Sequence, residues 1–87
     1  MGTQSLTSSE ELRRLRWQCR RGTRELDALL LRYLDRLYPT ASQAQRAVFE
    51  RLLSVQDPQL ADWFYGRAKS PDAELQAMVD SILDVPV

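Results

Sequence analysis

Residues 24–39, RELDALLLRYLDRLYP, hold the most regular pattern in this chain of 87 residues. Apolar side chains recur there at three- and four-residue steps, the spacing that places them on one face of an α-helix. They are Leu26, Leu29, Leu30, Tyr33, Leu34 and Leu37. Thr23 precedes the pattern as a candidate N-cap, Glu25 complements the positive end of the helix dipole, and Pro39 ends the helix. The stretch predicts an amphipathic helix whose apolar face must be covered by other parts of the chain.

Four further segments have helical spacing and start signals. Capping boxes, Ser followed three residues later by Glu or Gln, stand at residues 8–11 and 42–45. Asp-Pro at 57–58 and Ser-Pro at 70–71 are typical of an N-cap followed by a first-turn proline. The apolar positions expected on the buried faces are Leu12, Leu15 and Cys19; Ala44, Val48, Leu52 and Val55; Leu60, Trp63 and Phe64; and Leu75, Met78, Val79, Ile82 and Leu83.

Short links between five such helices of about 10–15 residues favour antiparallel neighbours. No alternation of apolar and polar residues that would indicate a strand runs for long. The expected fold class is therefore all-α, a single compact five-helix bundle. One domain is expected over residues 1–87, with loose ends at 1–7 and 84–87.

Composition excludes several classes of protein. The chain is 44% hydrophobic and 28% charged, which is ordinary for one small globular domain. It has one cysteine and no histidine, so internal disulfides, Ser-His or Cys-His catalysis and His-ligated zinc are excluded. No apolar run approaches the ~18–20 residues that span a bilayer, and no signal peptide is recognised after Met1. The start at Met1 without a transit peptide favours a bacterial cytoplasm, and we expect a non-enzymatic monomer without membrane insertion.

The net charge of zero hides an asymmetry between the two halves of the chain. Residues 1–46 carry nine arginines and five acidic residues, whereas residues 47–87 carry three basic and seven acidic residues. Six arginines and no acid lie within residues 13–24: Arg13, Arg14, Arg16, Arg20, Arg21 and Arg24. Trp17 lies among them, off the apolar stripe. Trp with Arg is the composition of an interface anchor, or of a stacking site for single-stranded nucleic acid, and packing of Trp17 into the core is a third alternative.

Most other polar residues are expected to be structural. Surface charges and helix caps account for Asp27, Asp35, Glu50, Asp72, Glu74 and Asp80. Cys19 is expected to be a buried apolar side chain, although Arg20 and Arg21 beside it could activate a nucleophilic thiolate. Gly22 is expected to close the first helix with positive φ. The arginines around it are left unexplained by these roles, so the residues alone predict a small helical binding module with a charged docking surface.

The segment WQCRRGTRELD, residues 17–27, resembles the signature of the FAD assembly factors of succinate dehydrogenase and fumarate reductase (SdhE type). The hallmark of that family is Arg-Gly-x-x-Glu, present here as Arg21, Gly22 and Glu25. Two further segments are similar to the family in order and spacing, FERLLSVQDPQLADWF at residues 49–64 and DAELQAMV at residues 72–79. The resemblance also implies a five-helix bundle.

The resemblance further implies a function. Such a protein binds the flavoprotein subunit of succinate dehydrogenase or fumarate reductase and promotes covalent attachment of FAD to a histidine of that partner. The FAD belongs to the partner, and no catalytic, cofactor-binding or metal-binding residue is expected in this chain. The residues expected to bind the partner are Trp17, Arg20, Arg21, Gly22, Arg24 and Glu25.

Two alternatives remain open at the level of the sequence. One is a small helical antitoxin or regulator that sequesters another protein through the same surface. The other is a nucleic-acid-binding module that uses the arginines around Trp17. The zero net charge and the acidic second half of the chain count against nucleic acid, which is therefore not the expected partner.

Overall fold

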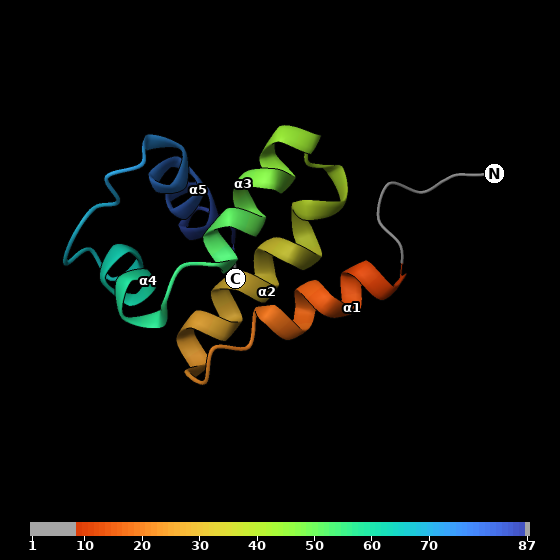
Figure 1. Ribbon diagram of the computed structural model, residues 1–87, viewed down its shortest axis with the longest axis horizontal. Helices are drawn as coiled ribbons and strands as arrows, with labels where there is room; N and C mark the ends of the chain where they lie inside the picture. The colour runs from red at the N-terminus through yellow and green to blue at the C-terminus, as the bar shows by residue number, and fades with distance from the viewer. Residues whose placement is uncertain (1–8, 87) are drawn as a thin grey trace.

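Helix α2 (Arg24–Arg36) runs through the middle of the molecule, and the other helices are arranged around it (Figure 1). The structure is a computed structural model that describes residues 9–86. Within that range the chain forms five α-helices and one short 3₁₀ helix and contains no strand. The remaining elements are α1 (Ser9–Gln18), the 3₁₀ helix η1 (Tyr38–Thr40), α3 (Gln43–Leu53), α4 (Asp57–Phe64) and α5 (Ala73–Leu83). The all-α, five-helix prediction is confirmed.

The apolar face of α2 is covered from two sides. Helices α1 and α5 pack against it, and α5 also packs against α3 and α4. The buried residues of α2 are Leu26, Leu30, Tyr33 and Leu34. No polar or charged residue of the described chain is buried, so the core depends on apolar packing. No helix in residues 9–86 is long and apolar enough to cross a bilayer.

Helix α3 is rotated about its axis relative to the prediction: of the expected residues, Leu52 is buried, and Val48 and Val55 pack only partly against the core. Phe49, Leu52 and Leu53 are buried, whereas Ala44 is exposed and Val48 is only partly buried. The cause is the ring of Phe49, whose centroid lies 4.6 Å from that of Tyr33 and 5.8 Å from that of Tyr38. Burying this aromatic group removes more apolar surface from water than burying Ala44 does. The rotation of α3 therefore follows its largest side chain.

Capping was predicted well at α3 and less well at α4 and α5. The Ser42 hydroxyl accepts from the Gln45 amide at 3.1 Å, and the Ser42 amide donates to the Gln45 side chain at 3.0 Å, so this capping box is confirmed. The N-cap of α4 is Gln56 instead of Asp57. The N-cap of α5 is Asp72, whose carboxylate accepts from two amides of the first turn, instead of Ser70.

Three other expectations concern the ends of the helices. Thr23 occupies the N-cap position of α2 with an extended backbone, but its side chain makes no capping bond. Leu83 was expected on the buried face of α5 and is 46% exposed, because it lies at the last position of the helix beside the buried Ile82. The predicted capping box that begins at Ser8 lies outside the described residues.

The segment after α5 packs against α2. Val85 is 6% exposed. Arg32 Nη1 donates to the Val85 carbonyl at 3.4 Å, and Arg36 Nη1 donates to the Pro86 carbonyl at 3.0 Å. Two arginines on successive turns of α2 thus hold the main chain of residues 85–86, and the Val85 side chain adds to the apolar core.

We predict that Val85→Ala lowers the free energy of unfolding by about 1–2 kcal/mol, because it removes two buried methyl groups. Leu83→Ala is the matched control two residues earlier. Its side chain is half exposed, so its free energy of unfolding should stay within about 0.5 kcal/mol of the wild-type value. Urea denaturation followed by circular dichroism measures both. Equal losses in the two variants would contradict a packed C-terminal segment.

Candidate partner-binding site

The loop between α1 and α2, residues 19–23, carries the centre of the predicted site. It begins where α1 closes, with the Cys19 amide bonded to the Leu15 and Arg16 carbonyls and the Arg20 amide bonded to the Trp17 carbonyl at 3.1 Å. Gly22 follows with φ of +95°, in the left-handed region that side chains with a Cβ rarely adopt. A Cβ built at Gly22 meets no atom within 4 Å, so the glycine is required by the backbone and not by crowding.

Arg21 points inward and is largely covered, with 14% of its side chain exposed. Its Nε donates to Asp57 Oδ1 at 2.8 Å, and its Nη1 donates to the Gln18 and Leu53 carbonyls, both at 2.9 Å. Its Nη2 donates to the Val55 carbonyl at 2.5 Å. One guanidinium therefore joins the end of α1, the end of α3 and the first turn of α4.

The other side chains of the predicted site are exposed, in contrast to that of Arg21. Trp17 is 72% exposed at the end of α1. Arg20, Arg24 and Glu25 are also exposed, and their side chains make no hydrogen bond or ion pair with any part of the chain between residues 9 and 86. In the sequence, two of these four residues precede Gly22 and two follow it. They are available to a partner molecule, whereas Arg21 is engaged within the protein.

The six arginines of residues 13–24 do not form one continuous basic surface. Arg16 pairs with Asp35 on α2, with an Nη2 to Oδ1 distance of 2.5 Å, and Arg21 is turned inward. Arg13, Arg14, Arg20 and Arg24 remain exposed. Neutralising two of the six charges lowers the positive potential expected of a nucleic-acid interface.

Cys19 is fully buried, and burial raises the pKa of its thiol to about 12. Arg16 and Arg21 lower this pKa, but they do not offset the loss of solvation. A thiol with such a pKa stays protonated near neutral pH and is a poor nucleophile. The position of Cys19 in the core agrees with the expected apolar role.

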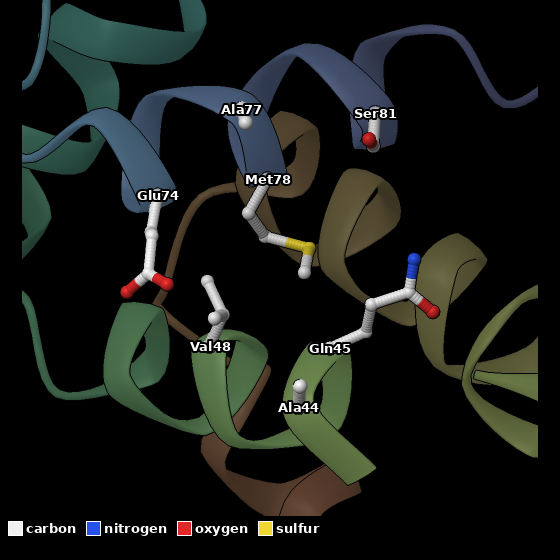
Figure 2. A pocket seen from close by; sticks show the side chains of 7 residues that line it. All are labelled: Ala44, Gln45, Val48, Glu74, Ala77, Met78 and Ser81. Atoms are coloured by element: carbon white, nitrogen blue, oxygen red, sulfur yellow. The ribbon is translucent and has the colours of Figure 1, made fainter. Parts of the chain in front are cut away.

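A shallow groove lies between α3 and α5 (Figure 2). Val48 from α3 and Met78 from α5 point toward one another across it, and small residues such as Ala44 and Ala77 leave it open. Its single charged lining residue, Glu74, is paired with Arg51 at 2.7 Å. No group of three or more potential metal ligands occurs in residues 9–86. This groove offers shape and apolar surface but no reactive group.

Sequence reasoning missed the two aspartates that support the loop. Asp57 was interpreted as a helix cap, yet its carboxylate accepts from Arg21. Asp27 was counted as a surface charge, yet its Oδ1 accepts from the Arg21 amide at 2.5 Å. The only signal in the chain was that both residues lie inside segments that resemble the assembly-factor family, residues 17–27 and 49–64.

Comparison with known proteins agrees with this resemblance. A family profile described as "Flavinator of succinate dehydrogenase" matches residues 13–86. The chain is 45% identical over 80 residues to the FAD assembly factor SdhE of Idiomarina loihiensis, covering 92% of this chain and 89% of that protein. It is 44% identical over 79 residues to the FAD assembly factor SdhE of Pseudomonas putida, covering 91% and 94% of the two chains.

A third relative, the FAD assembly factor SdhE of Colwellia psychrerythraea, is 49% identical over 70 residues, 80% of this chain and 77% of that protein. These matches include the loop, both supporting aspartates and the helices that carry them. They support a role in FAD assembly of succinate dehydrogenase. The chain belongs to the family of flavinators of succinate dehydrogenase, the SdhE-type FAD assembly factors.

Proposed function

We propose that this protein binds the flavoprotein subunit of succinate dehydrogenase, and of the related fumarate reductase, and promotes covalent attachment of FAD to a histidine of that subunit. The observation that carries the proposal is the exposed set Trp17, Arg20, Arg24 and Glu25, which lie before and after the open Gly22 in the sequence. An exposed aromatic side chain among unpaired charges is typical of a protein interface.

The chemistry belongs to the partner under this proposal. This chain has no histidine, its cysteine is buried, and its exposed residues are suited to binding. Binding favours a conformation of the flavoprotein in which the FAD methyl carbon and the histidine nitrogen are held close together. The Trp17 ring anchors the contact, and Glu25 forms charge-assisted hydrogen bonds that fix its register. The assembly factor thus contributes positioning.

Deletion of the gene tests the proposed function directly. Covalent flavin remains bound after denaturation, so its fluorescence on the flavoprotein band of a denaturing gel measures attachment. The band should lose its fluorescence in the deletion strain and regain it when the chain is supplied in trans. Unchanged fluorescence would overturn the proposal. Salt-dependent binding of the purified protein to nonspecific DNA would instead support the nucleic-acid alternative.

Glu25→Gln separates a binding role from a helix-dipole role. Loss of a first-turn carboxylate costs at most about 0.3–1 kcal/mol of stability. Loss of a charge-assisted hydrogen bond to the partner costs about 1.5–3 kcal/mol, which is tenfold or more in affinity. We predict a small change in melting temperature and at least a tenfold weaker affinity for the flavoprotein, measured by calorimetry.

Glu74→Gln is the matched control, because Glu74 also lies in the first turn of a helix and is exposed. It should lower stability somewhat more, since its ion pair with Arg51 is lost. It should leave flavoprotein affinity unchanged. Wild-type affinity in Glu25→Gln would return Glu25 to a purely structural role.

Gly22→Ala and Gly22→Arg separate backbone strain from surface contact. Both add a Cβ at positive φ and should each lower stability by roughly 1–2 kcal/mol. The space around Gly22 is open, so the Arg side chain adds little further strain within the protein. It does project into the space that a docked partner needs. We predict that flavin attachment is abolished in Gly22→Arg and only reduced in Gly22→Ala.

The matched pair for this experiment is Gly66→Ala and Gly66→Arg, since Gly66 has φ of +77° and is also open. Both should lower the melting temperature without affecting flavin attachment. A folded Gly22→Arg protein with full attachment would remove Gly22 from the binding site.

A further inference from the structure

The conformation of the α1–α2 loop is maintained by groups far away in the sequence. Figure 1 shows the loop beside the start of α4, and the Arg21 side chain joins the two. Four of its bonds are to Gln18, Leu53, Val55 and Asp57. A guanidinium has five N–H donors, so this set leaves it little capacity for another ligand.

The charge of Arg21 is also balanced where it lies. The Gln18 and Leu53 carbonyls are at the C-terminal ends of α1 and α3, where helix dipoles place partial negative charge. Asp57 supplies a full negative charge in the first turn of α4. Moving the guanidinium outward toward a partner would leave these acceptors without their donor. The inward position is therefore the favoured one.

The main chain of Arg21 is fixed as well. Its amide donates to Asp27, which lies on α2 one turn after the loop. Arg21 is thus held by its side chain on one side of the loop and by its backbone on the other. The residue that follows is Gly22, whose unusual φ and open surface define the centre of the site.

We propose that Asp57 and the α3–α4 turn order the α1–α2 loop before binding by holding Arg21 inward. Arg21 and Asp57 are then positioning residues, and the exposed Trp17, Arg20, Arg24 and Glu25 contact the flavoprotein. This inference rests on the proposed function. A loop that is already ordered before binding loses less conformational entropy when it binds, which raises affinity without any new contact.

Asp57→Asn gives opposite results under the two possible roles of Arg21. If Arg21 is a positioning residue, weakening its ion pair loosens the loop, and affinity for the flavoprotein falls about tenfold. If Arg21 instead contacts the flavoprotein, freeing its guanidinium leaves affinity unchanged or increases it. Affinity is measured by calorimetry with the flavoprotein subunit from the same organism, at a temperature where the circular dichroism of each variant shows the folded protein.

Arg21→Lys is an independent test of whether Arg21 is a positioning residue. Lysine retains the positive charge but cannot reproduce the forked geometry that reaches two helix ends and Asp57. A positioning role predicts that Arg21→Lys binds as weakly as Arg21→Gln, whereas a direct charge contact predicts that Lys retains most of the affinity. Arg51→Lys is the matched control, because Arg51 forms a similar fork to Asp72 and Glu74 between α3 and α5. It should bind like the wild type.

Amide hydrogen exchange supplies a readout that needs no partner. In Asp57→Asn the Arg21 amide should exchange at least tenfold faster, while the amide of Leu30 in the core of α2 should change only by the factor that the variant's loss of global stability gives. Weaker binding together with faster loop exchange supports the inference. Wild-type affinity overturns it, and so does weaker binding with unchanged exchange, because Asp57 would then itself touch the partner. If the wild-type protein does not bind the flavoprotein, the proposed function fails, and the exchange rates still decide whether Asp57 orders the loop.

Discussion

The apolar face of α2 imposes the main constraint on this fold. A helix of 13 residues is marginal on its own in water, because nucleation is costly and a short helix has few bonds to repay it. Its buried leucines and Tyr33 gain stability only when other elements cover them. The chain meets this need by packing α1 and α5 against α2, and then α3 and α4 against α5. The packing of α1 against α2 also determines where the loop between them, residues 19–23, lies.

The loop at the start of α2 is a consequence of that packing. Since α1 must return onto α2, the chain reverses direction within residues 19–23, and Gly22 allows the turn through its positive φ. The same packing brings the ends of α1 and α3 close together, so their free carbonyl groups need a donor. Arg21 supplies it to both, and Asp57 completes the ion pair. One side chain thus satisfies two helix ends and orders the loop.

The fold was largely predictable because its signals are local. Spacings of three and four residues identified the helices, and the capping box of Ser42 and Gln45 involves groups only three residues apart. The errors arose where packing overrides local preference, as when Phe49 between two tyrosines determined the rotation of α3. The direction of Arg21 was not predictable for the same reason. Its acceptors Leu53, Val55 and Asp57 lie 32 to 36 residues away, so no local sequence pattern predicts these contacts.

The motif Arg-Gly-x-x-Glu therefore combines two kinds of residue within five positions. Glu25 faces solvent and has no partner in the described chain, whereas the Arg21 side chain is largely covered and makes four hydrogen bonds within the protein. Gly22 between them belongs to both groups, since its backbone is dictated by the fold and its surface is open. A motif of this kind can look like one charged patch in the sequence. In the folded protein the side chain of its first residue is bonded to the ends of α1 and α3 and to α4, whereas its last residue stays exposed, as do Trp17, Arg20 and Arg24.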